Sequence, residues 1–281
     1  MLRLFLSLLN ETFQKWNANR APKMGAALSF YAVFSLAPLA ILLMSFVSFV
    51  VGRDAARIEM IGRFRDLVGT QGAEVLEMIL AKTVPLNTSL LGTIIGFVVL
   101  LIGASGVFGE LQSSLNQIWD VKPKHHPLLV IVKEHLFSFA MVFLMGFLML
   151  VSFLLSATTA AAGSFLHAQL PELDGPWELG NSLISLLVIA LLFSLIFRVV
   201  PDTLVEWKDV WLGAILTSIL FVLGKYVLGF YFGRSAVASS YGAAGSLIIL
   251  LIWIFYSAQI LFFGAEFTRV YASRYGSLRK R

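Results

Sequence analysis

Cysteine is absent from this 281-residue sequence, so disulfides, thiolate metal ligands and a cysteine nucleophile are excluded. Charged residues make up only 13% of the chain, about half the fraction usual for a soluble domain. The hydrophobic fraction of 58% excludes an intrinsically disordered chain, because disorder requires low hydrophobicity. The composition therefore indicates a protein that packs against lipid, and its 24 phenylalanines suit that environment.

The net charge of +5 raises the question of a nucleic-acid partner. The Lys and Arg residues, however, lie beside the apolar runs, as anchors to the inner leaflet of a membrane do. We therefore expect membrane lipids as partners and no nucleic acid. We also expect no cleaved signal peptide, because no small-residue cleavage site follows the short apolar patch Leu4–Leu9.

Six long apolar runs predict an all-α, polytopic membrane protein with six transmembrane helices and additional amphipathic interfacial helices. The clearest run, Gly245–Phe263, carries no charge and is long enough for an α-helix to cross a hydrocarbon layer of about 30 Å. It is apolar on every side, unlike the helices of a soluble protein. The other runs are Gly25–Val51, Ser89–Phe108, Leu136–Ala160, Ser182–Val200 and Val210–Phe232.

We expect a single membrane domain over residues 1–281 with three attached segments. The apolar pattern of residues 1–23 predicts a cytoplasmic amphipathic helix. This helix lies on the membrane or, alternatively, binds a partner. Residues 52–87 predict an outer segment of two amphipathic helices broken near Gly69–Gly72, which could cap a vestibule or serve as a connector. Residues 269–281 predict a basic cytoplasmic tail.

The distribution of basic residues predicts the orientation of these spans. With six spans, about two thirds of the 21 Lys and Arg residues fall on the side that holds both termini. The positive-inside rule makes that side cytoplasmic. We therefore expect a multi-pass protein of the bacterial cytoplasmic (inner) membrane, with both the N-terminus and the C-terminus in the cytoplasm.

The first span contains three candidate residues of a substrate pathway, namely Tyr31, Ser35 and Pro38. Their spacing of i, i+4 and i+7 places them on one face of a helix. Pro38 removes a backbone hydrogen bond and should kink that helix. A kink beside hydroxyl groups suits the wall of a pathway, although Ser and Tyr can equally form hydrogen bonds to neighbouring helices.

The last two spans contain three polar side chains at positions where lipid contact is costly. Lys225 lies deep in the fifth span, where it either extends its ammonium group towards the interface or faces a substrate or Gln259. Gln259 lies inside the sixth apolar run, and Glu266 lies near its end, at the depth of the headgroups. We expect Tyr31, Ser35, Lys225, Gln259 and Glu266 to line one central cavity.

The segment Glu110–Val121 follows the second span and predicts an amphipathic continuation along the inner surface. Its polar side includes Asn116, and Trp119 is expected at the membrane interface. Glu110 and Asn116 complete the set of pathway candidates from the inner side.

No metal site and no cofactor are expected. His125 and His126 occur in a basic loop, but adjacent residues point to different sides of the backbone, and no His pair is spaced i, i+4 on a helix. No catalytic residues are predicted, and nothing in the sequence indicates an oligomeric state.

Three stretches resemble the YihY/BrkB family of bacterial inner-membrane proteins, which was once labelled ribonuclease BN. They are AALSFYAVFSLAPL at Ala26–Leu39, GASGVFGELQSSLNQIW at Gly103–Trp119, and Tyr241–Thr268. The resemblance implies a six-helix membrane protein and connects the chain with virulence, since BrkB was named for serum resistance. It also implies transport of a lipid or small solute, and it supplies no agreed catalytic residues.

Three functions are open at this stage. The first is a transporter or exporter of a lipid-like or small amphiphilic solute, with polar residues of the helix bundle lining a central cavity. The second is a structural protein that supports envelope assembly without transport. The third is a membrane-bound ribonuclease, which we expect least, because no inner loop is long enough to build a folded nuclease site.

Overall fold

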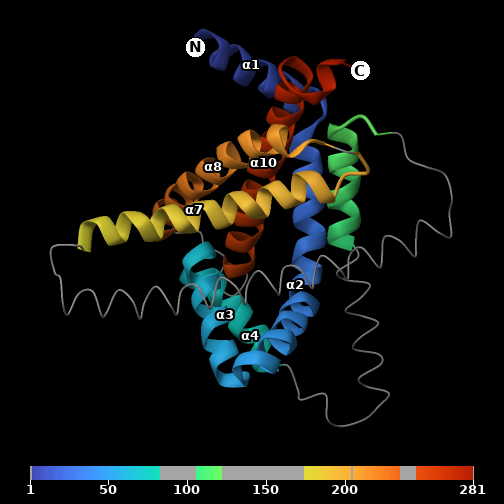
Figure 1. Cartoon of the computed structure of the whole chain (residues 1–281). Helices are drawn as coiled ribbons and strands as arrows, with labels where there is room; N and C mark the ends of the chain where they lie inside the picture. Colours follow the sequence, from blue (N-terminus) through green and yellow to red (C-terminus); the bar gives the residue numbers. More distant parts are fainter. Residues whose placement is uncertain (1, 83–105, 122–173, 204, 235–244, 281) are drawn as a thin grey trace.

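The structure, a computed structural model, describes residues 2–82, 106–121, 174–203, 205–234 and 245–280, and in these ranges it contains helices and no strand (Figure 1). The predicted all-α class is therefore confirmed. Three predicted features lie outside these ranges. They are the third span, the loop with His125 and His126, and the second span except for its last three residues. The helices are α1 (Leu2–Ala18), α2 (Ala21–Val51), α3 (Arg53–Val68), α4 (Thr70–Lys82), α7 (Asp174–Val199), α8 (Trp207–Arg234), α10 (Gly245–Arg274), the 3-10 helix η4 (Ser277–Lys280) and an unlabelled helix over 106–118.

Three of these helices are long and apolar enough to cross a membrane, and they match the fourth, fifth and sixth predicted spans. The spans cover Ser182–Val199 of α7, Trp207–Phe232 of α8 and all of α10. A fourth helix, α2, qualifies if its two segments count as one span, and it matches the first prediction. The chain is thus an integral membrane protein, while the number of six spans stays a prediction.

The helix α2 begins one turn earlier than the apolar run predicts and bends where the sequence places its proline. Pro22 stands in its first turn, where the missing N–H costs no hydrogen bond. The segments 21–37 and 39–51 meet at an angle of 48°, with Pro38 between them. The predicted kink is confirmed, and its cause is the hydrogen bond that proline cannot donate.

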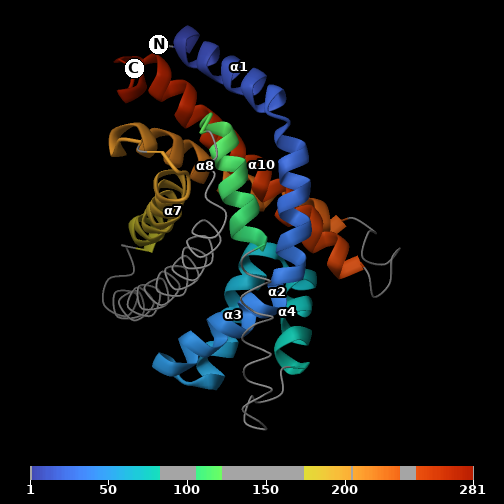
Figure 2. The same cartoon turned by 90° about the vertical axis from the view of Figure 1, so that its right-hand side faces the viewer.

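The last helix, α10, lies at the centre of the molecule and packs against α8, α2, α1 and α4 (Figures 1 and 2). The largest buried cluster combines side chains of α2, α7, α8, α10 and the helix 106–118. It includes Phe197, Phe262, Leu115 and Ile118, each almost fully buried. The core of the described part of the chain therefore forms around the sixth predicted span.

Small residues let α8 and α10 approach closely. A Cβ atom added at Gly264 of α10 would lie 1.8 Å from Thr217 Oγ1 of α8, and one added at Gly213 of α8 would lie 1.7 Å from Thr268 Oγ1 of α10. Each glycine thus receives a threonine from the opposite helix. This reciprocal packing replaces the hydrophobic effect, which cannot drive helix association inside lipid.

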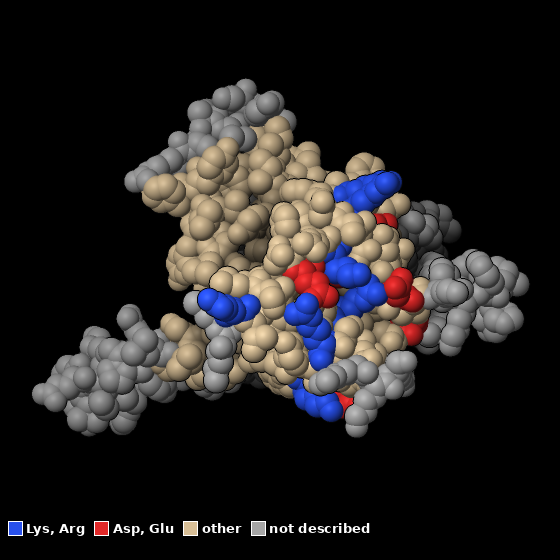
Figure 3. Space-filling view, turned by 90° about the horizontal axis from the view of Figure 1, so that it is seen from above, with Lys and Arg blue, Asp and Glu red and all other residues tan. Residues whose placement is uncertain are grey.

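Both chain ends lie at one end of the molecule, which we call the terminal end, and α3 and α4 lie at the opposite end (Figure 1). Two contacts hold the terminal end together. Arg274 of α10 forms an ion pair of 2.8 Å with Glu11 of α1, and the buried Asp209 of α8 accepts hydrogen bonds from the backbone N–H and the hydroxyl group of Ser277. Lys and Arg side chains gather on this surface, with some Asp and Glu between them (Figure 3).

The predicted pair of helices after the first span is confirmed over its described part. The helices α3 and α4 are separated by Gly69, which has a φ of 84°, a conformation that glycine adopts without steric cost. The break falls at the start of the predicted Gly69–Gly72 stretch. The sidedness of this segment, outside the cell membrane, stays a prediction.

Candidate functional site

Two predicted pathway residues of α10, Gln259 and Glu266, face the beginning of α2. They are two turns apart and therefore share one face of the helix. Glu266 is fully buried, and Asn19, in the turn between α1 and α2, donates a hydrogen bond of 2.5 Å from Nδ2 to its Oε1. Gln259 donates a hydrogen bond of 3.4 Å from Nε2 to the carbonyl oxygen of Ala21. Gly25 of α2 lies against the amide of Gln259. We call the group Asn19, Gly25, Gln259 and Glu266 the polar seam.

One oxygen atom of each α10 side chain in the polar seam has no hydrogen-bond partner among the described residues. These atoms are Oε1 of Gln259 and Oε2 of Glu266, and both are buried. A buried acceptor without a partner costs about 1–3 kcal/mol, and more if it is charged. Such atoms are therefore candidates for contact with a bound solute, ion or proton, and the polar seam is the part of the described chain where two of them lie on one helix face.

A second network supports the polar seam on the side of the helix 106–118. Arg269 of α10 forms an ion pair of 2.8 Å with Asp120 and also donates to the carbonyl oxygen of Ile118. Gln117 donates a hydrogen bond of 3.1 Å to the carbonyl oxygen of Asn19. The turn that carries Asn19 is thereby held by two helices that are distant in sequence.

The two turns that meet at this network have unusual backbone conformations. Arg20 has a φ of 56° and Asp120 a φ of 57°, and both are non-glycine residues. Left-handed residues other than glycine cost energy and are concentrated at sites where the surrounding structure holds them in place. The connection between α1 and α2 is therefore a constrained part of the fold and not a loose linker.

Analysis of the sequence did not identify Asn19, Asp120 or Arg269 as site residues. The only local signal for Asn19 is its place in a polar stretch just before Pro22, which predicts a turn and says nothing of a partner. Its partner Glu266 is 247 residues away along the chain. Only the packing of α10 against the start of α2 reveals this contact.

The pathway candidates in α2 have contacts of a different kind. Ser35 is fully buried and donates to the carbonyl oxygen of Ala32 in its own helix, and not to a neighbouring helix as the alternative for this residue predicts. The ring of Tyr31 is partly exposed and lies against Gly106, where an added Cβ would come within 3.0 Å of it. Pro38 marks the bend of the helix. Ser35 and Pro38 therefore act within α2, and Tyr31 forms a contact with the helix 106–118.

The helix 106–118 positions the two inner candidates on its polar side. Glu110 accepts a hydrogen bond of 3.4 Å from Ser114, and Asn116 exchanges two hydrogen bonds, of 2.8 and 3.0 Å, with Asp202 in the turn after α7. Trp119 is only 7% exposed and packs into the core, so it does not face lipid, while its depth at the membrane interface stays a prediction. The cause is the Asn116–Asp202 pair and the Arg269–Asp120 ion pair, which hold this helix against the bundle.

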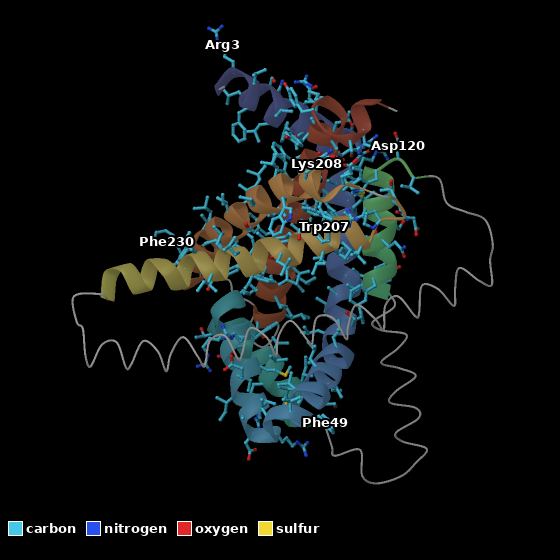
Figure 4. The ribbon with its side chains drawn as sticks, viewed as in Figure 1. Arg3, Phe49, Asp120, Trp207, Lys208 and Phe230 are labelled. Carbon is cyan, nitrogen blue, oxygen red and sulfur yellow. The ribbon has the colours of Figure 1, made fainter. Side chains whose placement is uncertain are left out.

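Lys225 lies apart from the polar seam, in a crevice between α8 and α10. The crevice is too narrow to enclose a water molecule, and it is lined by Phe221, Lys225, Leu228, Trp253, Tyr256 and Ser257. Figure 4 labels Trp207 and Lys208 at the start of α8, which is nearer the terminal end, and Phe230 near the other end of this helix. The prediction that the candidates line one cavity stays a prediction. The structure places Gln259 and Glu266 in the polar seam and Lys225 in this crevice. The other candidates lie on α2 (Tyr31, Ser35, Pro38) and on the helix 106–118 (Glu110, Asn116).

Acidic and histidine side chains do not gather into a metal site in the part of the chain that the structure describes, where no group of three or more could hold an ion. The chemistry available at the polar seam is therefore that of one carboxylate, two amides and a nearby guanidinium group. These groups can bind a polar or cationic group and can exchange a proton.

Comparison with known proteins links the chain to one family. The sequence model of the family described as Virulence factor BrkB matches residues 12–281. A UPF0761 membrane protein of Verminephrobacter eiseniae is 32% identical over 187 residues, which are 66% of this chain and 43% of the relative. A UPF0761 membrane protein of Chromobacterium violaceum is 28% identical over 89% of this chain and 58% of its own length.

A further relative has a different name. The ribonuclease-like protein YfkH of Bacillus subtilis is 23% identical over 93% of this chain and 94% of its own length. The chain therefore spans about half the length of the two UPF0761 proteins and nearly all of YfkH. No solved structure matches the chain.

Proposed function

Because this chain belongs to the Virulence factor BrkB family of membrane proteins, we propose that it carries a lipid-like or small amphiphilic solute across the bacterial inner membrane. The observation that carries the proposal is the polar seam, where two buried acceptors without partners among the described residues lie on one face of α10. Polar groups inside a membrane are costly and commonly mark the path of a substrate or ion.

The bend of α2 supports the same function. The polar seam lies against the first half of α2, and the bend at Pro38 separates that half from the rest of the helix. A helix whose backbone hydrogen bonding is interrupted can change its angle at small cost, as the gating helices of transporters do. Movement of α2 relative to α10 would open and close the polar seam.

Transport should depend on where the Gln259 amide lies. Replacing Gly25 by alanine would place a Cβ atom 1.9 Å from Gln259 Nε2, so the amide must move away from the polar seam. The end of a glutamine side chain is flexible, and we expect little loss of stability. In proteoliposomes, we expect the protein to move fluorescent short-chain phospholipids or lysophospholipids between leaflets, and Gly25→Ala to slow that movement at least several-fold.

Gly229→Ala serves as the matched control for this measurement. No atom lies within 4 Å of a Cβ added there, so transport should remain as in the unmodified protein. If vesicles with the protein exchange none of these lipids faster than empty vesicles do, the proposed function is wrong. An unchanged rate in Gly25→Ala would remove the polar seam from the pathway.

Both termini are proposed to lie in the cytoplasm, with α3 and α4 on the other side. The absence of cysteine makes this easy to measure, because single cysteines can be introduced at Arg3 and at Arg53. A maleimide that cannot cross the inner membrane should label Arg53→Cys in cells with a permeabilised outer membrane, and Arg3→Cys only after lysis. Labelling of both from the same side would overturn the proposed topology.

A role in envelope assembly is the second candidate, and one surface supports it. On α3 and α4, at the end opposite the termini, Ile58 is 73% exposed and Met78 is 51% exposed. Exposed apolar side chains outside the spans suit a docking surface. If this function is the correct one, Ile58→Ser with Met78→Ser should abolish the cellular role of the protein, while Gly25→Ala should leave it unchanged.

We propose no enzymatic activity for the chain. The name of the Bacillus subtilis relative describes that protein as ribonuclease-like. Cleavage of RNA needs a metal-binding carboxylate cluster or an acid–base pair together with a basic groove. Incubation of the purified protein with RNA, with and without a divalent metal ion, should give no cleavage above that of a mock preparation.

A further inference from the structure

Glu266 of α10 is a buried acid that forms no ion pair in the part of the chain that the structure describes. Asn19 donates a hydrogen bond to its Oε1, whereas its Oε2 has no partner among the described residues. Arg269, one turn further along α10, is engaged by Asp120 and by the carbonyl oxygen of Ile118. A buried carboxylate without an ion-pair partner is costly, and binding of a proton or another cation lowers this cost.

The charged groups that act on Glu266 come from three elements. They are Arg269 of α10, Lys15 of α1 and Asp120 after the helix 106–118, and among the described residues α2 and α8 add none. Burial favours the protonated carboxyl group, whereas the hydrogen bond from Asn19 and the two positive charges favour the carboxylate. Because these effects oppose each other, a proton can both bind to this group and leave it.

The surroundings of Oε2 favour a proton over a metal ion. A metal ion such as Ca²⁺ or Mg²⁺ needs about six oxygen ligands, whereas a proton needs one acceptor and no cavity. No group of three or more acidic or histidine side chains in the described ranges could hold an ion. The other buried acceptor without a partner there, Oε1 of Gln259, belongs to a residue about 10 Å away along α10, too far to share an ion with Oε2.

We propose that Glu266 binds and releases the proton whose gradient drives transport. The inference rests on the proposed function and names the ion to which movement of the solute is coupled. The proton comes from water, bonds to Oε2 and turns the negative carboxylate into a neutral carboxyl group. Its release to water restores the carboxylate, and no other bond forms or breaks.

The hydrogen bond from Asn19 connects the proton to the movement of α2. Asn19 lies in the turn between α1 and α2, and its bond to Glu266 is charge-assisted only while the carboxylate is ionised. Charge-assisted hydrogen bonds are about twice as strong as neutral ones. Protonation therefore weakens one of the two hydrogen bonds between the polar seam and the start of α2, while the bond from Gln259 to Ala21 is unchanged. This half of α2 is the one that the bend at Pro38 separates from the rest.

Infrared spectra can show the proton on Glu266 directly. A protonated carboxyl group shielded from water has its C=O stretch at a higher frequency than the hydrated carboxyl groups of the surface. We expect such a band in difference spectra of the full-length protein in liposomes, recorded between mildly acidic and mildly alkaline pH. Because the chain has 16 Asp and Glu residues, the assignment requires Glu266→Gln, which should remove the band.

Glu206→Gln is the matched control for the infrared measurement. Glu206 is an exposed residue just before α8 and forms an ion pair with Lys208. Exposed ion pairs contribute little to stability, so this variant should fold and keep the band. If the unmodified protein shows no such band at any pH, or if the band remains in Glu266→Gln, the inference is wrong.

Movement of the fluorescent lysophospholipid in proteoliposomes tests the coupling. In the unmodified protein, we expect a pH gradient across the vesicle membrane to raise the rate at least several-fold and a protonophore to remove the increase. A sodium gradient should have no effect. Glu266→Gln cannot exchange the proton, so its rates with and without the pH gradient should be equal, whereas Glu206→Gln should respond as the unmodified protein does.

These two measurements separate the inference from the proposed function. If the unmodified protein moves the lipid at the same rate with and without the pH gradient, or responds to sodium instead, the inference fails and the proposed function stands. If Glu266→Gln removes the infrared band but no vesicle moves the lipid under any gradient, the proposed function fails and Glu266 remains a proton-binding residue. The response of the unmodified protein to the gradient does not depend on the folding of any variant.

Discussion

Replacing Gly264 by alanine is expected to destabilise the protein by about 3 kcal/mol, the upper end of the cost of an added methyl group in a packed core. The new Cβ would lie 1.8 Å from Oγ1 and 2.9 Å from Cβ of Thr217, so it meets the stiff part of a β-branched side chain. Thr217 is itself fully buried, and its hydroxyl group donates to the carbonyl oxygen of Gly213. The helices α8 and α10 would have to separate to make room.

Unfolding by SDS in mixed micelles measures this effect. Gly229→Ala, on the open side of α8, is the control, and it should be neutral or stabilising because alanine favours the helix by about 1 kcal/mol over glycine. Adding Thr217→Ala to Gly264→Ala removes the Oγ1 and Cγ2 atoms of Thr217 but leaves its Cβ at 2.9 Å, so it should restore part of the lost stability. Equal stability of Gly264→Ala and the unmodified protein would show that α8 and α10 do not pack as described.

Replacing Asn19 by leucine is expected to cost about 3 kcal/mol, because it leaves both carboxylate oxygens of Glu266 buried without a hydrogen bond. The loss should depend on the carboxylate. Replacing Glu266 by leucine as well removes the group that needs the bond, and the double variant should recover part of the stability. Glu266→Gln should cost less than Asn19→Leu, since its amide oxygen can still accept the hydrogen bond from Asn19.

A double-mutant cycle with these variants, measured by the same unfolding method, gives the coupling between α10 and the turn before α2. Asn17→Leu is the matched control, because Asn17 is an exposed residue of α1, two positions from Asn19. It should change the free energy of unfolding by no more than about 0.5 kcal/mol. Strictly additive effects of Asn19→Leu and Glu266→Leu would contradict the role given to this hydrogen bond.

The sequence indicated only some residues of the candidate site. Gln259 and Glu266 stand out because polar groups are rare in an apolar run, and in the structure Glu266 is buried. The partners of these residues carry no comparable signal, since Asn19 lies in an ordinary polar turn and Gly25 is one of 22 glycines. A polar residue in a span indicates that a partner is needed. The identity of the partner depends on which faces of two helices pack together.

The sequence by itself determined the membrane class, the four described spans, the bend at Pro38 and the break at Gly69. These features are local, because hydropathy depends on a run of neighbouring residues and backbone preference on a single one. Only the tertiary structure decided that Asn19 meets Glu266, that Gly213 receives Thr268, and that Trp119 enters the core. Such contacts depend on the rotation and depth of each helix relative to the others, and many weak interactions along the whole chain set these together.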